Sequence, residues 1–396
     1  MGGVRNKAGT METDRALEED LFRMLRAALG TGEGPESPGW RPLFEEMKAQ
    51  TVAALPGAWL ETHPIPGAEA WRDFCLAQRA QWLRVMQGQA ELLARMEEWG
   101  IPCVILKGAA AAAAYPHPML RMMGDVDFLV RREDFTRTAA RLEEAGYRLT
   151  HRKNDAHHHY CYARGGVHFE LHRRPGGLKE GEEALIGLFE GGVENRTWAE
   201  CEGFRFPVLP AELNGLSLLL HIRQHLREGL GLRQIVDWSA YLGQLGEEKR
   251  QEKLLPLVRQ AGLEKLETAV TELCRQRLGL RAPAAPEACP WEELLDLILE
   301  KGNFGRKAGE RGKTAAFLLS AEDGAGFFDR LQRGGLCRWK AAERHRILRP
   351  FAWIYQGFRI LGIFVREGIG PRELAAQRRK GLAQRRLMER LGVEKR

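Results

Sequence analysis

Two short apolar segments on either side of a run of alanines constrain the fold more than any other feature of this chain. The first is IPCVILKG (residues 101–108), which is rich in β-branched residues and ends at a glycine, and the second is GDVDFLV (residues 124–130). Runs this short and apolar are typical of buried strands, and the alanines between them favour a short helix. Further along, the pattern predicts a helix over 131–147 and strands over 147–152, 157–163 and 167–173. The chain is therefore expected to have an α+β fold with a small mixed-sheet core.

Helical patterns flank this core on both sides. Apolar residues recur at helical spacing over 13–29, 43–55 and 68–99, and helices dominate again after the strand-like segment FRFPVLPAE (residues 204–212). We expect four regions: an N-terminal helical region (1–99), the α/β core (100–178), a strand and then a helical acceptor or substrate region (179–290), and a basic helical region (291–396).

Two carboxylates stand at the start of the second apolar segment. Residues two apart in a strand point to the same side, so Asp125 and Asp127 share one face while Val126 and Phe128 share the other. Two neighbouring carboxylates repel each other unless a cation lies between them, and Mg²⁺ is held by a few carboxylate oxygens together with water and phosphate. D-x-D alone is also common in loops and turns, but a buried strand that ends at a glycine upstream and an ionisable strand downstream favour a metal site here.

The segment VHFELHR supplies a third carboxylate. His168, Glu170 and His172 alternate with Phe169 and Leu171, so one face of this strand is ionisable and the other apolar. If the strand lies beside GDVDFLV, then Glu170 joins the two aspartates around one or two cations, an arrangement suited to displacement at a nucleotide phosphorus. The two histidines could orient Glu170 or touch substrate, and they could equally be structural.

These residues resemble a known superfamily. The strand that ends in Lys107-Gly108, the short helix, Arg121, GDVDFLV and the later Glu170 strand are similar to the nucleotidyltransferase superfamily with the DNA polymerase β-like fold. The stretch ILKGAAAAAAYPHPMLRMMGDVDFLV resembles more closely the uncharacterised bacterial nucleotidyltransferase family of the NTP_transf_5 type. The resemblance is sharp over residues 101–173.

The resemblance implies roles for particular residues. Asp125, Asp127 and Glu170 correspond to the metal-ligating catalytic carboxylates, with Mg²⁺ or Mn²⁺ as the metal. The phosphate-binding turn of the superfamily is only partly present, because Ala109 stands where a serine is expected. Backbone amides after Gly108 and the charge of Lys107 could replace it. Arg121 is expected to bind the triphosphate or the pyrophosphate, because guanidinium binds phosphate in a two-pronged fashion, or else to serve as a counterion for Asp125.

The function implied is the transfer of a nucleoside monophosphate from an NTP, with ATP the preferred candidate, to an acceptor with release of pyrophosphate. The acceptor is unidentified and could be a sugar, a peptide, a protein or a small molecule. Two alternatives stay open. One is a non-catalytic member that binds a nucleotide or a partner, which the missing serine favours. The other is a phosphotransferase that uses the same metal site.

Three groups of polar residues have two interpretations each. His221 and His225, like Arg233 and Asp237, are four residues apart and so lie adjacent on a helix face. They could line a cleft, although a structural network between packed helices is slightly favoured. The run HHHY (residues 157–160) is interpreted as a solvated strand or loop, because at most two of its histidines could hold a metal together.

Charge and cysteine content indicate which partners and which cellular compartment to expect. The formal net charge is +7, and residues 341–396 alone hold 14 Lys and Arg against 5 Glu, so the basic excess belongs to this C-terminal tail. The last part of this tail, residues 378–396, lacks aromatic residues for stacking on bases, which makes nucleic acid an unexpected partner. Seven scattered cysteines without a C-x-x-C pair indicate reduced thiols in a cytoplasmic protein. No transmembrane segment is expected, since the apolar stretch 351–365 is short and contains Arg359.

Overall fold

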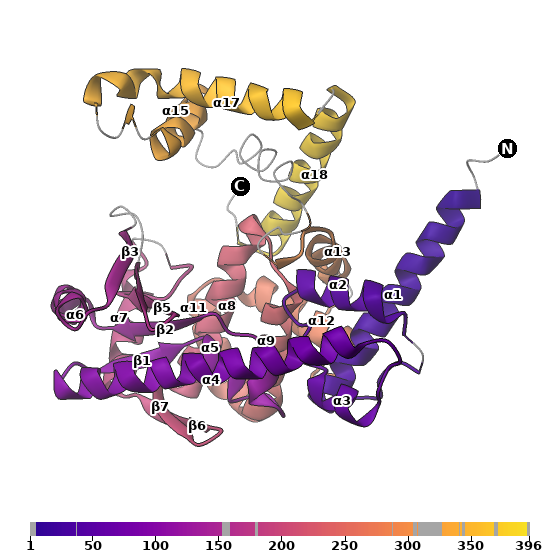
Figure 1. Cartoon of the computed structure of the whole chain (residues 1–396), viewed down its shortest axis with the longest axis horizontal. Coiled ribbons are helices and arrows are strands. Elements are labelled where there is room, and N and C mark those ends of the chain that lie inside the picture. Colours follow the sequence, from indigo (N-terminus) through magenta and orange to yellow (C-terminus); the bar gives the residue numbers. More distant parts are fainter. Residues whose placement is uncertain are drawn as a thin grey trace. The chain divides into compact units, whose positions relative to one another are not determined.

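The chain divides into two compact units in the computed structural model, residues 1–304 with 391–393, and residues 305–390 with 394–396. The residues that the structure describes are 5–36, 38–152, 159–178, 181–286, 288–303, 307, 327–339, 341–342, 345–367 and 371–393. The first unit holds all strands of the described chain together with most of its helices (Figure 1). The fold is α+β, as the sequence predicts.

A seven-stranded mixed sheet lies at the centre of the first unit. Its strands are β1 (Cys103–Leu106), β2 (Asp125–Val130), β3 (Arg148–Arg152), β4 (His159–Arg164), β5 (Val167–His172), β6 (Thr197–Cys201) and β7 (Phe204–Val208). Their order across the sheet is β3-β4-β5-β2-β1-β7-β6. The pairs β2–β5 and β1–β7 are parallel and the other pairs are antiparallel. The ionisable strand β5 therefore lies directly beside β2.

Helices precede, interrupt and follow the sheet. Those of the first unit are α1 (Arg5–Leu29), α2 (Trp40–Ala49), α3 (Gly57–Thr62), α4 (Glu69–Glu98), α5 (Gly108–Ala112), η1 (Pro118–Leu120), α6 (Arg132–Glu144), α7 (Glu183–Glu194), α8 (Ala211–Glu228), α9 (Leu232–Leu245), α10 (Glu247–Lys249), η2 (Arg250–Leu254), α11 (Leu255–Gln260), α12 (Glu264–Leu278) and α13 (Trp291–Lys301). Those of the second unit are α15 (Phe327–Arg338), η4 (Arg346–Phe351), α17 (Ala352–Glu367) and α18 (Pro371–Arg390).

One face of the sheet is the apolar core. The side chains of β2 and β5 that alternate with the carboxylates, among them Phe128 and Phe169, are buried there together with apolar residues of α4 and α6. The long helix α4 runs across the sheet (Figure 1). It approaches closely at Gly88, where a Cβ would come within 3.1 Å of a Val167 methyl group. Because this face is filled by packing, the polar residues of β2 and β5 are confined to the opposite face.

The turn between β4 and β5 fixes the register of the polar face. Gly165 and Gly166 both have positive φ, 57° and 77°, which is the backbone of a two-residue type I′ hairpin turn. Arg164 consequently pairs with Val167, Cys161 with Glu170, and His159 with His172. The turn joins two of the strands that the sequence predicts, those over 157–163 and 167–173.

Two expected elements differ from the structure. The helix predicted over 43–55 ends at Ala49, because the chain turns at Thr51, whose φ is 59°. Strand β6 was not predicted. Most of its side chains are exposed, since it is the edge strand next to β7, and an exposed edge strand need not show an apolar alternation.

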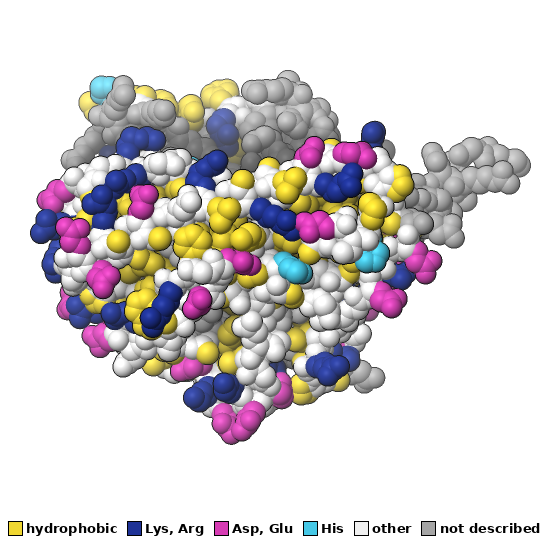
Figure 2. All heavy atoms as spheres, turned by 60° about the horizontal axis from the view of Figure 1, so that its bottom comes forward, with side chains coloured by type: hydrophobic (Ala, Val, Ile, Leu, Met, Phe, Trp, Pro, Cys, Tyr) yellow, Lys and Arg dark blue, Asp and Glu magenta, His cyan; other side chains and the backbone are white. Residues whose placement is uncertain are grey.

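The surface shows no single dominant charge on the face seen in Figure 2, where described acidic and basic side chains are interspersed with apolar ones. None of the helices in the described part of the chain is both long and apolar enough to cross a membrane.

Candidate active site

The pairing of β2 with β5 brings two of the predicted carboxylates together. Asp127 lies opposite Glu170 and Asp125 lies opposite His168 in the parallel register. On the other side of β2, Leu106 of β1 lies opposite Asp127, so Lys107 enters the site from the end of β1. Three strands thus contribute to one polar face.

Asp127 is the centre of this face. Its Oδ1 accepts hydrogen bonds from Lys107 Nζ at 3.2 Å and from His172 Nε2 at 2.8 Å. Burial alone would raise the pKa of Asp127, but Lys107 and the His172 hydrogen bond outweigh it and hold the pKa well below its ordinary value. Burial lowers the pKa of Lys107 and of His172, yet the carboxylates raise both above their ordinary values. Asp127 is therefore an anion held by the Lys107 ammonium group and the His172 imidazole.

Lys107 has a backbone conformation that is unusual for a residue with a side chain. Its φ is 45° and its ψ is −125°, a region that strongly favours glycine and costs of order 1–3 kcal/mol for other residues. The helix that follows, α5, has only five residues, and all of them are buried. Strained backbone of this kind clusters at functional sites. Here the strained residue is the one whose side chain donates a hydrogen bond to Asp127.

Asp125 is the carboxyl group of the cluster whose ionisation is least favourable. Burial, Asp127 and Glu170 raise the pKa of Asp125 to about 6, and the nearby cations Lys107 and Arg233 offset this only in part. Glu170 behaves differently: burial raises its pKa, but the hydrogen bond from His172 and other contacts lower it below the ordinary value. At neutral pH the site therefore holds three adjacent carboxylates, of which Asp125 is the least stable as an anion.

The substitution Asp125→Asn is expected to stabilise the metal-free protein at pH 7. The raised pKa means that the folded state is penalised once Asp125 ionises, so this penalty is absent below about pH 4 and is complete above about pH 6. We expect a gain of about 1–2 kcal/mol at pH 7, less than the full linkage value because the carboxylate is partly exposed, and no gain near pH 4. Urea unfolding at both pH values measures it, and a gain of equal size at pH 4 would contradict the explanation.

The donor set fits a divalent cation. Ligand atoms of Asp127, Glu170 and His172 lie within 4.8 Å of one another, and a second group of the described chain, His159, Cys161 and Glu170, is equally close. Asp125 belongs to neither group, although its charge acts on both carboxylates. Carboxylate oxygens are the preferred ligands of Mg²⁺ and Mn²⁺, and a cation would relieve the repulsion that raises the pKa of Asp125.

Arg121 has a different partner from the one that the sequence suggests. It forms a buried, two-pronged ion pair with Asp237 of α9, with Nε–Oδ1 2.8 Å and Nη2–Oδ2 2.7 Å, and Tyr115 donates to the same Oδ1 at 2.6 Å. Its partner is therefore Asp237, and not Asp125 as the counterion interpretation has it. Asp237 is likewise bonded to Arg121 and not to Arg233, its neighbour in the helical pattern.

The remaining cleft candidates occupy the surroundings of the site. Arg233 contacts the backbone oxygen of Met122 at 3.4 Å, and burial and Arg121 lower its pKa. His221 and His225 lie on α8 with their Nε2 atoms 2.8 Å apart. Burial and the charge of Lys107 lower the pKa of both, to about 4 for His225, so both imidazoles are neutral at pH 7. His168 is exposed at the start of β5.

Two residues of the polar face were missed by the sequence interpretation. His159 is buried, with its Nε2 3.8 Å from Glu170 Oε2, so the solvated interpretation of HHHY is wrong for this residue. His157 and His158 lie outside the described residues. Cys161 lies beside Glu170 on β4. The alternation His159-Tyr160-Cys161-Tyr162 indicates that His159 and Cys161 share one face of a strand. It places them in the site only once β4 is known to pair with β5.

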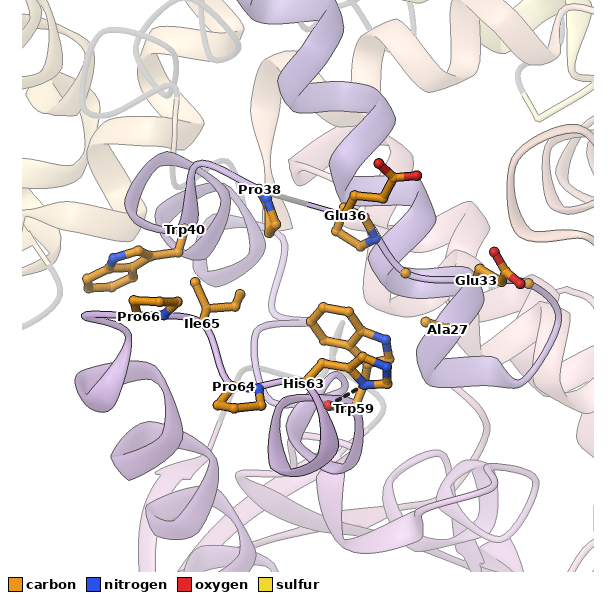
Figure 3. Close-up of a pocket in the computed structure, with 13 residues that line it drawn as sticks. Ala27, Glu33, Glu36, Pro38, Trp40, Trp59, His63, Pro64, Ile65 and Pro66 are labelled. Atoms are coloured by element: carbon orange, nitrogen blue, oxygen red, sulfur yellow. Dashed lines mark hydrogen bonds between the residues drawn. The ribbon is translucent and has the colours of Figure 1, made fainter.

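A cavity of about 770 Å³ lies in a different part of the first unit (Figure 3). It is lined by residues between Ala27 and Pro66, including Trp40 and Trp59, with the Trp59 ring stacked on His63. None of the candidate site residues lines it. The polar face of β2 and β5 is consequently the site that the geometry favours for chemistry.

Comparison with protein families agrees with the geometry. The model of the family described as "Uncharacterised nucleotidyltransferase" matches residues 36–279, which include β1 to β7 and helices α2 to α12. The chain belongs to this nucleotidyltransferase family. Comparisons with curated proteins and with solved structures find no match.

Proposed function

We propose that this protein is a metal-dependent nucleotidyltransferase that moves a nucleoside monophosphate from an NTP to an acceptor group and releases pyrophosphate. The observation that carries the proposal is the register of β2 and β5, which sets Asp127 opposite Glu170 with Asp125 on the same face. Membership of the nucleotidyltransferase family supports the same reaction class.

Asp125, Asp127 and Glu170 would hold one or two Mg²⁺ or Mn²⁺ ions. When bound, these ions would neutralise the triphosphate and polarise the phosphorus that is attacked. Lys107 and His172 are hydrogen-bonded to Asp127 in the metal-free protein. Because Lys107 Nζ is largely buried beside the carboxylates, its charge is also placed to bind the phosphate oxygens of a nucleotide on this face.

Arg233 is a better phosphate ligand than Arg121. The Arg121 guanidinium is bonded to Asp237 on two nitrogens, so binding a phosphate would require breaking a buried ion pair. Arg233 lies close enough to Asp125 to lower its pKa, and its buried Nε makes no hydrogen bond within the described structure. We assign to Arg233 the role of holding the triphosphate or the pyrophosphate.

One observation favours the non-catalytic alternative. Ala109 occupies the position of the serine in the superfamily's phosphate-binding turn, and it is buried at the start of α5. No side-chain hydroxyl is available there. A protein of this fold that binds a nucleotide without transferring it would keep the metal site and lose the turn.

Nucleotide binding is the first test. Calorimetric titration with ATP, GTP, CTP and UTP, with and without Mg²⁺, is expected to show Mg²⁺-dependent binding of one or more of them. Binding should be lost in Asp125→Asn/Asp127→Asn and kept in Glu200→Gln, a control that removes an exposed carboxylate of β6. Binding that is indifferent to Mg²⁺ and to the double substitution, or no binding of any NTP, would contradict the proposed site.

Product analysis then separates the candidate reactions. Pyrophosphate formed from the bound NTP indicates nucleotidyl transfer, whereas a nucleoside diphosphate indicates phosphoryl transfer. Binding without either product, in the presence of candidate sugar and peptide acceptors, supports the non-catalytic alternative.

A further inference from the structure

A histidine and a cysteine of β4 lie against the candidate active site. The register pairs Cys161 with Glu170 and His159 with His172, so both β4 side chains share the polar face with the carboxylates. Cys161 Sγ is 3.9 Å from Glu170 Oε1, and His159 Nε2 is 3.8 Å from Glu170 Oε2. The two β4 residues therefore approach the two oxygens of the same carboxylate.

We propose that His159, Cys161 and Glu170 form a second cation site, one that takes Zn²⁺ or a similar thiophilic divalent ion. Their ligand atoms all lie within 4.8 Å of one another. In a tetrahedral zinc site with bonds of about 2.0–2.3 Å, ligand atoms are roughly 3.3–3.8 Å apart. Small side-chain movements are enough to close the site.

The ligand types separate this site from its neighbour. Thiolate and imidazole favour zinc, whereas carboxylate, water and phosphate oxygens favour magnesium. Asp125 and Asp127 offer oxygens only, and His159 and Cys161 offer nitrogen and sulfur. The shared residue is Glu170, which lies between the two sets.

Sharing Glu170 has a consequence that rests on the proposed function. An ion held by His159 and Cys161 would draw the Glu170 carboxylate towards β4 and away from Asp127. A thiophilic ion would then inhibit nucleotidyl transfer, and a chelator would restore it.

Most of the other cysteines that the structure describes are buried, so they compete little with Cys161 for an added metal ion. Cys75, Cys103 and Cys201 are buried, and burial raises their pKa to about 12, 12 and 11, so these thiols stay protonated at neutral pH. Of the cysteines whose side chains the structure describes, Cys161 and Cys289 are partly exposed. Cys289 lies in the segment before α13, outside the sheet, and is a matched control.

Cobalt titration tests the site without nucleotide. Co²⁺ added to the full-length, reduced, metal-free protein is expected to produce a near-ultraviolet thiolate-to-cobalt charge-transfer band that Zn²⁺ abolishes. The band should persist in Cys289→Ser and disappear in Cys161→Ser. Substitution of a residue that only hydrogen-bonds to a metal ligand already weakens metal binding about 10–100-fold. His159→Gln removes a direct ligand and is therefore expected to weaken Co²⁺ binding about 100-fold.

The outcome does not depend on the nucleotidyltransferase proposal, since no NTP is present. A band of unchanged intensity in Cys161→Ser, or no band in the unsubstituted protein at millimolar Co²⁺, would overturn the second site. Circular dichroism checks that each variant is folded. If Cys161→Ser does not fold, the loss of affinity in His159→Gln decides the question alone.

Discussion

Asp127→Asn is expected to lower the rate of pyrophosphate release by about 10³-fold or more, with the protein still folded. Asp127 is the carboxylate that faces Glu170 across the β2–β5 pair and is bonded to both Lys107 and His172. Loss of its charge weakens metal binding and leaves the buried Lys107 without its anion. The stabilisation that a metal supplies to phosphoryl chemistry is several kcal/mol, and each 1.36 kcal/mol is tenfold in rate. Steady-state assays with the NTP that binds best measure the effect.

The matched control for this prediction is Asp296→Asn. Asp296 is an exposed residue of α13 that is far in sequence from the sheet, and its replacement should leave the rate unchanged. Turnover of Asp127→Asn within threefold of the unsubstituted enzyme would show that this residue does not hold a catalytic metal.

Asp237→Leu is expected to destabilise the first unit by about 3–5 kcal/mol. Asp237 and Arg121 are almost fully buried, and Asp237 accepts two bonds from Arg121 and one from Tyr115. Removing the carboxylate leaves a buried guanidinium without an anion, which is among the costliest changes in a protein interior. Urea unfolding at pH 7 measures the loss.

Two further variants test the explanation. Glu45→Gln breaks an exposed ion pair with Lys48 and should cost less than about 1 kcal/mol. The double substitution Arg121→Met/Asp237→Leu removes both charges and should recover much of the loss. If the double variant is no more stable than Asp237→Leu, an unpaired Arg121 is not the cause of the destabilisation.

The alternation of side chains made half of the site predictable. In β2 and β5 the period of two identifies Asp125, Asp127 and Glu170 as members of polar faces, and the apolar residues between them as core. The sequence left open whether these two strands lie side by side, and the structure shows that they do. The local pattern was sufficient to assign side chains to the polar and the apolar face, because the two faces of each strand differ so sharply in polarity.

Partners that are distant in sequence could not be predicted in the same way. Arg121 is 116 residues from Asp237, and periodicity states which face a residue occupies without stating what it meets there. The same limit applies to His159 and Cys161, which become part of the site only through the pairing of β4 with β5. Charged residues have several plausible partners, and tertiary packing selects among them.

The division of β5 into two faces also bears on how such a protein can change over evolutionary time. Val167, Phe169 and Leu171 pack in the core under α4, while His168, Glu170 and His172 project to the polar face. Substitutions that alter the chemistry and substitutions that alter the packing thus fall on alternate residues of the same six-residue strand. Selection can therefore act on the reaction and on the stability of the fold through different side chains, even though those side chains are immediate neighbours in the chain.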